Sequence, residues 1–304
     1  MERCDILIVG AGAAGMAAAL GAAEAGASRI LLLDRAERPG GILPQCIHSG
    51  FGLHRFHEDL RGPEYAARYA AMLAAEPAIE LRLGTTVLSL SGDRTALLSS
   101  RAGLERVAFA RCLLCCGARE KPIGALNIAG TRPAGIFTAG QAQALVNLGG
   151  YDVGRRIVIL GSGDIGMIMA RRFALLGREV AALVEQSAAL GGLARNRRQC
   201  VEAFHIPVRL RSTVTEIHGM PRIAGVTLRD LDSGAEELLP CDTLVTAVGL
   251  IPERELEKPL LRGGQPPDWL AFAGNCAHIH EIVDSVSEEA QALGAAAAQA
   301  IAQK

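Results

Sequence analysis

The chain has 304 residues, 50% of them hydrophobic, and its 31 Lys and Arg residues nearly balance 32 Asp and Glu residues, for a net charge of −1. This balance gives no electrostatic reason to expect nucleic acid or an anionic membrane as a partner, and an aromatic content of 4% argues against base-stacking surfaces. The length allows two domains of ordinary size.

The first predicted element is an apolar strand over residues 5–9 that leads directly into a glycine-rich loop. The loop has G-x-G-x-x-G spacing at Gly10, Gly12 and Gly15, a helical pattern follows, and a second strand ends at Asp34. Such glycines allow a tight turn and let a pyrophosphate approach the N–H groups of the helix, while the carboxylate accepts hydrogen bonds from a ribose. This unit therefore predicts a dinucleotide site.

The following segment contains Gly40-Gly41 and a polar loop with Cys46 and His48. Its patterns predict a helix over 63–75 and strands over 81–83, 86–90, 96–99 and 106–110, with a separate buried strand over 112–118. Cys112 and Cys115 form a C-x-x-C pattern on that strand. Because strand residues i and i+3 point to opposite faces, we expect the two thiols to be structural rather than paired.

The first unit is then repeated. A strand over 156–160 precedes Gly161, Gly163 and Gly166, and a strand over 180–184 ends at Glu185. The interval from the first glycine to the acidic residue is the same as in the first unit. Two loops that each have a preceding strand, a following helix and an acidic residue at this spacing strongly indicate two dinucleotide sites. Beyond this unit we expect a helix over 195–204, strands over 208–210 and 242–249, and a meander over 213–239.

The tail contains a strand over 270–273, the turn Gly274-Asn275 and an Ala-rich helix over 288–302. A piece of this size cannot bury its own core, so we expect it to rejoin an earlier sheet. The predicted fold class is α/β, with two Rossmann-like three-layer (ββα) nucleotide-binding domains, the second inserted into the first. The outer domain comprises residues 1–118 and 246–304, and the inner domain comprises 119–245.

The N-terminal residues show no secretory signal pattern, and the eight cysteines are scattered rather than arranged as a disulfide framework. The Ala-rich run over 11–27 contains Glu24 and glycines, which argues against a membrane segment. We therefore expect a cytoplasmic protein.

Further motifs carry a resemblance to known proteins. Cys115-Cys116-Gly117-Ala118, Thr246-Ala247-Val248-Gly249 and Ala273-Gly274-Asn275 resemble turns of the two-dinucleotide flavoproteins, the pyridine-nucleotide oxidoreductase group that includes thioredoxin reductase. The stretches 40–52, 130–140 and 274–280 resemble a narrower subgroup. That subgroup is the FAD/NAD flavoprotein subunit encoded with FAD-dependent glycerol-3-phosphate dehydrogenase, which is related to the α subunits of opine, hydroxyproline and proline dehydrogenases.

The resemblance implies FAD in the outer domain and a nicotinamide nucleotide in the inner one. The implied FAD residues are Gly10, Gly12, Gly15, Asp34, Gly41, Gly274 and Asn275, and the implied nucleotide residues are Gly161, Gly163, Gly166 and Glu185. Further cofactor contacts are assigned to Ala13, Ala14, Arg35, Gly117, Asp164, Ile165 and Gly249. A carboxylate at Glu185 favours a free 2′-hydroxyl, so NADH is expected over NADPH, although Arg178 and Arg195 are close in sequence.

The sequence departs from the dithiol enzymes of this group. Residues 138–141 read Thr-Ala-Gly-Gln where thioredoxin reductase has its C-x-x-C, and only Cys46 follows the Gly-Gly pair, so transfer to thioredoxin is not expected. Cys46 and His48 are the catalytic candidates, because a lone thiol becomes reactive when a neighbour lowers its pKa. The preferred interpretation is a cysteine packed beneath the flavin.

Cys276, His278 and His280 lie close together in sequence, but nothing nearby completes a four-ligand set, so no metal site is expected. A flavin contact, subunit docking and a plain surface loop remain open for this stretch.

The principal hypothesis is an oxidoreductase subunit that passes electrons between FAD and NAD(H). The resemblance of the chain to the narrower subgroup implies a partner flavoprotein that oxidises a small substrate such as glycerol 3-phosphate, an amino acid or an opine. Two alternatives remain. One is a stand-alone NADH oxidase or peroxidase that uses Cys46, and the other is a non-catalytic assembly subunit with ADP or ATP in the second site.

Overall fold

A computed structural model describes residues 1–261 and 264–303. The chain divides into two compact units. Unit 1 comprises Met1–Arg119 and Pro252–Lys304, and unit 2, Glu120–Ile251, is inserted between these segments. The chain returns to unit 1 at Pro252 rather than at residue 246, because Ala247 and Val248 still pack against the cores of unit 2. The connections pass through two short paired strands, β9 (Ala118–Glu120) and β19 (Leu250–Pro252).

Unit 1 is built on a seven-stranded sheet with the order β5-β2-β1-β8-β7-β6, to which β20 is added beside β8. Strands β5, β2, β1, β8 and β20 pair in parallel, and β6, β7 and β8 form an antiparallel meander. The strands are β1 (Glu2–Val9), β2 (Ile30–Leu33), β5 (Ile79–Arg82), β6 (Thr86–Ser91), β7 (Thr95–Ser100), β8 (Gly103–Leu114) and β20 (Leu270–Phe272). A small ribbon pairs β3 (Ser49–Phe51) with β4 (Leu60–Arg61).

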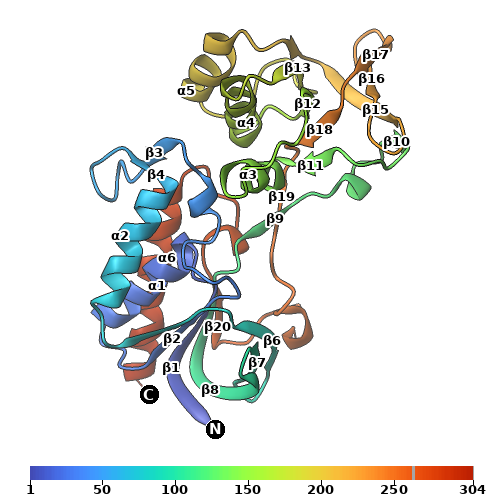
Figure 1. Ribbon diagram of the computed structural model, residues 1–304. Coiled ribbons are helices and arrows are strands. Elements are labelled where there is room, and N and C mark those ends of the chain that lie inside the picture. Colours follow the sequence, from blue (N-terminus) through green and yellow to red (C-terminus); the bar gives the residue numbers. More distant parts are fainter. Residues whose placement is uncertain (262–263, 304) are drawn as a thin grey trace. The chain divides into compact units, whose positions relative to one another are not determined.

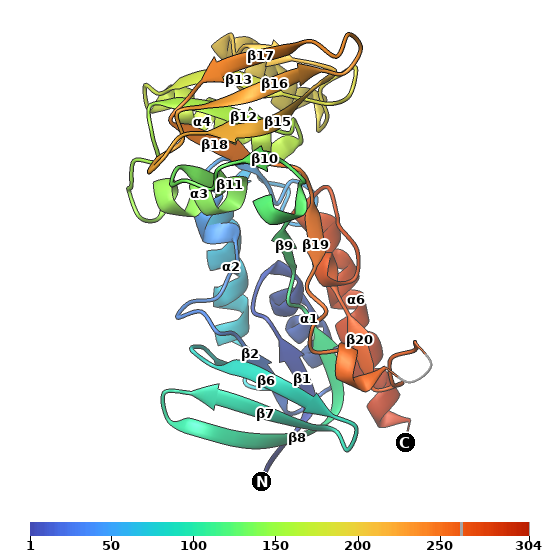
Figure 2. The same ribbon diagram turned by 90° about the vertical axis from the view of Figure 1, so that its right-hand side faces the viewer.

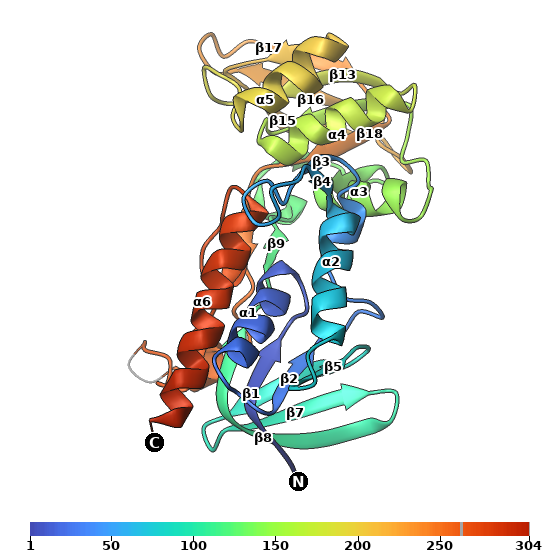
Figure 3. The ribbon, with the colours of Figure 1, turned by 90° about the vertical axis from the view of Figure 1, so that its left-hand side faces the viewer.

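The parallel strands of unit 1 are buried on both faces. Ile6 and Ile8 of β1 belong to a core that they share with the helices, whereas Leu7 and Val9 belong to a core shared with the meander. This division follows from the two-residue period of a strand. Helices α1 (Ala13–Glu24), α2 (Gly62–Ala74) and α6 (Val283–Ala302) lie on the first face (Figure 1, Figure 3).

Strand β8 corrects one prediction. The sequence indicated separate strands over 106–110 and 112–118, but the structure has one strand from Gly103 to Leu114. Its first part pairs with β7, and its second part, from Val107, pairs with β1. Arg111 interrupts the apolar pattern without breaking the strand, because its guanidinium reaches out to the carbonyl oxygen of Asp268.

The expected separation of the two cysteines on this segment is confirmed. Cys112 belongs to the meander-side core of unit 1 and Cys115 to the helix-side core, so their thiols lie on opposite faces of the sheet.

Unit 2 repeats the three-layer arrangement (Figure 2). Its five-stranded parallel sheet has the order β11-β18-β12-β13-β14, and its second sheet has the order β10-β15-β16-β17. The first sheet contains β11 (Ile136–Thr138), β18 (Thr243–Thr246), β12 (Arg156–Leu160), β13 (Glu179–Val184) and β14 (Val208–Arg209). The second contains β10 (Ala129–Gly130), β15 (Ser212–His218), β16 (Gly225–Asp230) and β17 (Glu236–Pro240).

Helices cover the other face of the parallel sheet in unit 2. They are α3 (Ala139–Asn147), α4 (Asp164–Leu175) and α5 (Ala194–Asn196), which continues through a π turn over Arg197–Val201 and a 3₁₀ turn over Glu202–Phe204. Ile157 and Ile159 face this helical core, and Val158 and Leu160 face the second sheet. The predicted fold class, two Rossmann-like ββα units in an α/β chain, is confirmed. Within the described part of the chain, none of the helices is long and apolar enough to cross a membrane.

The tail rejoins unit 1 as predicted, through β20 beside β8 and α6 against α1. Helix α6 begins at Val283, earlier than the predicted residue 288. The two helices approach closely where glycines replace side chains. A Cβ on Gly294 would lie 2.0 Å from the carbonyl oxygen of Ala18, and one on Gly21 would lie 2.1 Å from that of Gln291.

We predict that Gly294→Ala destabilises the protein, because the added methyl group would force the backbones of α1 and α6 apart. Overpacking of this kind costs about 1–3 kcal/mol, which exceeds the roughly 1 kcal/mol that Ala gains over Gly in helix propensity. Thermal melting of the two proteins measures the loss. Ala296→Ser, on the exposed face of α6, is the control and should leave the midpoint unchanged; an equally stable Gly294→Ala protein would contradict the close approach.

Candidate nucleotide-binding sites

The first glycine loop joins β1 to α1 in a turn that leaves no room for side chains at two of its glycines. Gly10 has a φ of +103°, and a Cβ there would lie 2.4 Å from the carbonyl oxygen of Cys115. A Cβ on Gly15 would lie 1.7 Å from the carbonyl oxygen of Gly10. The first and third glycines therefore serve the packing of helix against strand.

Asp34 ties this loop to the end of β2. Its Oδ2 atom accepts a hydrogen bond of 2.7 Å from the backbone N–H of Ala11, and its Oδ1 atom accepts one of 2.8 Å from that of Ala36. The carboxylate thus lies beside the loop, where it orders the backbone and still has lone pairs for a ribose hydroxyl. The neighbouring Arg35 is exposed.

Two further glycines of the predicted site meet the same loop. Gly41 lies over Gly12, since a Cβ on Gly41 would be 3.1 Å from the Cα atom of Gly12. The backbone N–H of Gly40 donates to the carbonyl oxygen of Ala11 at 2.8 Å. Gly274 packs on the start of α1, with its Cβ position 2.8 Å from the Cβ atom of Ala14. The structure therefore brings residues of three distant segments to one end of β1.

The second loop repeats this geometry in unit 2. Gly161 has a φ of +103°, and its Cβ position lies 2.3 Å from the carbonyl oxygen of Ala247. A Cβ on Gly166 would lie 2.3 Å from the carbonyl oxygen of Gly161. Asp164 opens α4, and its Oδ1 atom accepts hydrogen bonds from the backbone N–H of Leu193 at 2.8 Å and the amide of Asn196 at 2.7 Å.

Glu185 is held at the second loop by two serines that the sequence analysis did not single out. Its Oε2 atom accepts hydrogen bonds from the Oγ of Ser162 at 2.6 Å and from the Ser162 backbone N–H at 3.1 Å, and its Oε1 atom accepts one of 2.9 Å from the Ser187 N–H. Burial raises the pKa of the Glu185 carboxyl, but these hydrogen bonds outweigh burial and leave the pKa below its ordinary value. The group is therefore a carboxylate at neutral pH.

The signals for Ser162 and Ser187 were present but weak. Ser162 is the variable residue of the G-x-G turn, and Ser187 is two positions beyond Glu185. Such short polar residues frequently bond a neighbouring backbone or carboxylate, so their role becomes visible only when the loop and the strand end meet.

The middle glycines distinguish a packing role from a ligand-binding role. Apart from its two neighbours in the chain, no described residue has an atom within 4 Å of a Cβ position on Gly163. For Gly12 the nearest such atom is the Gly41 Cα, at 3.8 Å. A side chain at either position would occupy the space in front of the helix N-terminus, where a dinucleotide pyrophosphate binds. Gly117 and Gly249 likewise have open Cβ positions and positive φ angles. The residues present fit dinucleotides at both loops.

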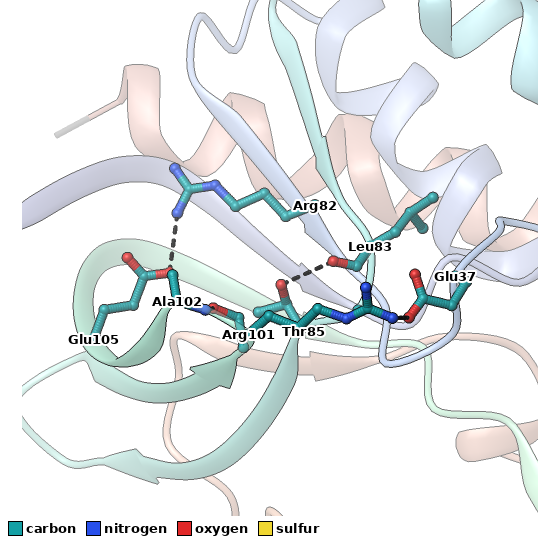
Figure 4. A pocket seen from close by; sticks show the side chains of 9 residues that line it. Glu37, Arg82, Leu83, Thr85, Arg101, Ala102 and Glu105 are labelled. Carbon is teal, nitrogen blue, oxygen red and sulfur yellow. Dashed lines mark hydrogen bonds and ion pairs between the residues drawn. The ribbon is translucent and has the colours of Figure 1, made fainter.

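A hollow of about 400 Å³ opens between the end of β5 and the β7–β8 turn in unit 1 (Figure 4). It is lined by Glu37, Arg82 to Thr85, Ser100 to Ala102 and Glu105. Its floor is joined to the end of β2, since the Thr85 N–H donates to the carbonyl oxygen of Asp34 at 2.9 Å. The ion pair of Arg101 with Glu37 is strongly exposed and contributes little energy.

The catalytic candidates in the polar loop are not in the state that a reactive thiol requires. Cys46 is buried, its Sγ donates to the carbonyl oxygen of Ile42 at 3.4 Å, and burial raises the pKa of its thiol to about 12. The Nδ1 atom of His48 lies 3.0 Å from the Ser49 carbonyl oxygen, and its ring lies 5.0 Å from that of Phe51. The thiol is therefore protonated at neutral pH.

The sequence does not predict two groups of contacting residues, because the members of each group are far apart in the chain. The Cys116 Sγ donates to the Val9 carbonyl oxygen and the Cys276 Sγ to that of Glu253, and the interaction between the two thiols lowers the pKa of Cys276 and raises that of Cys116. Glu289, on α6, lies beside His278 and His280. The expectation of no metal site was based on residues 276–280 alone, and Glu289 lies outside that stretch.

Two Rossmann-type units, each with a glycine loop and an ordered acid, define a nucleotide-dependent oxidoreductase of the flavoprotein type. The chain belongs to the pyridine nucleotide-disulphide oxidoreductase family, whose sequence profile matches residues 4–264. The family is FAD-dependent and uses NAD(P).

Curated relatives extend this assignment. The alpha subunit of sarcosine oxidase from Rhizobium meliloti (strain 1021) is 27% identical over 282 residues, which cover 87% of this chain and 26% of the relative. An opine oxidase subunit from Rhizobium meliloti is 27% identical, with 84% of this chain and 52% of the relative covered. Thioredoxin reductase of Treponema pallidum (strain Nichols) is 21% identical, with 82% and 77% covered. The chain therefore spans about a quarter of the sarcosine oxidase relative and about half of the opine oxidase relative.

Solved structures share the fold. Thioredoxin reductase of T. acidophilum superimposes with a TM-score of 0.77 at 22% identity, covering 99% of this chain and 98% of its own. That of Lactococcus lactis has a TM-score of 0.79 at 17% identity, with 99% and 100% covered. L-proline dehydrogenase of P. horikoshii has a TM-score of 0.70 at 17% identity, with 99% of this chain and 56% of that chain covered.

We predict that Gly163→Ala and Gly166→Ala separate nucleotide binding from folding. Gly163→Ala should leave the melting midpoint nearly unchanged but weaken nicotinamide nucleotide binding at least tenfold (about 1.4 kcal/mol), because its methyl group fills only ligand space. Gly166→Ala should instead destabilise the fold by about 1–3 kcal/mol. Calorimetric titration and thermal melting measure the two effects; unaltered nucleotide affinity in Gly163→Ala would place the nucleotide elsewhere.

Proposed function

We propose that this oxidoreductase passes electrons between NADH, bound at the second glycine loop, and FAD, bound at the first, and that its other half-reaction involves a partner subunit. The observation that carries the proposal is the duplicated loop with its ordered carboxylate, Asp34 in unit 1 and Glu185 in unit 2. Bound FAD would supply the ring that exchanges a hydride equivalent with the nicotinamide.

The contribution of the chain to this reaction is binding and orientation. Backbone N–H groups at the starts of α1 and α4 would hold the two pyrophosphates, and Asp34 and Glu185 would orient the riboses. The hollow between β5 and the β7–β8 turn would take the adenine end of FAD, because Thr85 in its lining donates a hydrogen bond to the backbone of Asp34. Hydride exchange between two bound rings requires no general base, so none is assigned to the chain.

The preference for NADH rests on the charge of Glu185. Hydrogen bonds from Ser162 and Ser187 keep this side chain ionised and pointed at the loop. A fixed negative charge there accepts hydrogen bonds from a free 2′-hydroxyl and repels a 2′-phosphate.

The partner is supported by the curated relatives. Two of them are named as subunits, of sarcosine oxidase and of opine oxidase, and each is longer than the part this chain matches. The chain contains neither a C-x-x-C at 138–141 nor a second cysteine in the loop after Gly40-Gly41. We therefore propose that electrons pass to or from a flavoprotein dehydrogenase of a small substrate, such as an amino acid, an opine or glycerol 3-phosphate.

Anaerobic titration of the FAD-loaded protein tests the proposal. We expect NADH to bleach the flavin absorbance at lower concentration than NADPH. Glu185→Gln should shift the ratio of the two dissociation constants by about tenfold toward NADPH, the equivalent of about 1.4 kcal/mol. Because the pKa of Glu185 is lowered, the wild-type preference should persist as the pH falls toward the ordinary Glu range and disappear only below it.

Glu202→Gln is the matched control, since it removes an exposed carboxylate of the same unit and should leave the ratio unchanged. Bleaching by neither nucleotide would instead favour a non-catalytic subunit with ADP or ATP in the second site. Equal use of both nucleotides by the wild type would refute the NADH preference and leave the electron-transfer proposal standing.

We further predict that Cys46→Ser retains both flavin reduction by NADH and turnover with an electron acceptor. The reason is that burial raises the pKa of this thiol to about 12, so almost no thiolate is present at neutral pH. Stopped-flow reduction and steady-state turnover measure the two steps. Cys4→Ser, at another buried thiol with a pKa of about 12, is the control. Loss of turnover in Cys46→Ser alone would support the thiol-dependent oxidase or peroxidase.

A further inference from the structure

Three side chains converge where the Gly274-Asn275 turn meets helix α6 in unit 1. The Nε2 atom of His280 lies 2.7 Å from the Oε2 atom of Glu289, and the Nε2 atom of His278 lies 3.5 Å from the same oxygen. The three potential ligand atoms lie within 4.8 Å of one another. Two histidines separated by one residue thus share a carboxylate that lies nine residues beyond His280.

The contact with Asn275 determines which ring nitrogen of a neutral His280 carries the proton. The backbone N–H of His280 donates to the Oδ1 atom of Asn275 at 3.0 Å, so the atom that faces His280 is an acceptor oxygen rather than the amide nitrogen. The Nδ1 atom of His280 lies 3.3 Å from this same oxygen and must carry a proton to bond with it. In a neutral imidazole the other nitrogen, Nε2, then presents a lone pair.

That lone pair points at another acceptor. With Nδ1 protonated, His280 Nε2 and Glu289 Oε2 are both acceptors, yet they lie 2.7 Å apart. A cation bound by both atoms would relieve the repulsion between the facing lone pairs. The His278 and His280 rings lie close together, with their centroids 4.0 Å apart, and the Nε2 atoms of both are near the same Glu289 oxygen. One divalent cation satisfies all three groups.

We propose that His278, His280 and Glu289 bind a divalent transition-metal ion of the Zn²⁺ class. Imidazole nitrogen and carboxylate oxygen are ligands that Zn²⁺ accepts, and three protein ligands leave a fourth tetrahedral position open. Asn275 acts as the positioning residue, because metal-binding histidines characteristically donate their second ring N–H to an oxygen that fixes the tautomer. On binding, the His280 Nε2 and Glu289 Oε2 atoms, now 2.7 Å apart, would separate slightly to make room for the ion.

The three side chains differ in exposure, so that an ion could reach the site from solvent and be held by a buried ligand on the other side. The side chain of His278 is 63% exposed, that of Glu289 is 33% exposed and that of His280 is 7% exposed, so the site is open on one side. The start of α6 is already tied to another segment of unit 1, because the buried Asp284 carboxylate in its first turn accepts hydrogen bonds from the Gly52 and His54 N–H groups. The bound ion would fasten the turn after Asn275 to α6.

Metal titration of the purified FAD-loaded chain, first freed of metal by chelator, tests this inference independently of nicotinamide binding. Zn²⁺ is followed by calorimetry and Co²⁺ by its visible absorption, which reports tetrahedral coordination. We expect one ion per chain, with affinity reduced at least about tenfold in Glu289→Gln, His280→Gln and His278→Asn. His278→Asn affects a largely exposed side chain and guards against a folding artefact.

Two further variants sharpen the test. Asn275→Ala should weaken binding about tenfold, as expected for a residue that orients a ligand. His205→Asn is the matched control, because His205 is an exposed histidine of unit 2 whose φ of +51° is compatible with Asn, and it should bind as the wild type does. Absence of a stoichiometric ion, equal affinity in the ligand variants, or thiolate-to-Co²⁺ charge-transfer bands would each overturn the proposal.

Discussion

Both units depend on one steric constraint, the contact of a helix with the strand that precedes it at a distance that only glycine permits. In unit 1 the Cβ position of Gly15 lies 1.7 Å from the Gly10 carbonyl oxygen, and in unit 2 that of Gly166 lies 2.3 Å from the Gly161 oxygen. The first N–H groups of a helix have no partner within the helix, so at each loop they remain available to a ligand in front of the helix N-terminus. A carboxylate from the next strand then orders the loop, so the backbone of each candidate site is held in place by the chain's own contacts.

The duplicated architecture does not make the two sites equivalent. Asp34 orders its loop through backbone N–H groups, whereas Glu185 also binds the hydroxyl of Ser162. The serine lies at the variable position of the turn, and it adds a short hydrogen bond that helps to keep Glu185 ionised despite burial. One motif therefore produces two carboxylates with different environments, and their environments bear on which nucleotide each loop would prefer.

The sequence predicted the local elements well and failed where a polar residue has a distant partner. The predicted gap between the strands over 106–110 and 112–118 falls at Arg111, but its guanidinium reaches the Asp268 carbonyl and β8 continues. The helix predicted from residue 288 begins at Val283, and Asp284 in its first turn is buried and accepts hydrogen bonds from the distant Gly52 and His54. Propensity cannot anticipate either case, because the compensating hydrogen bond comes from another part of the chain.

The sequence by itself determined the order of the elements, the two glycine loops and the acid at the end of each second strand, because these depend on periodicity and spacing within a few tens of residues. Only the tertiary structure decided which distant residues meet. It placed Gly41 over Gly12, Cys116 against Cys276 and Glu289 beside the two histidines. These contacts depend on the order of strands in the sheet and on the packing of α6 against α1, which bring together segments that no local pattern relates.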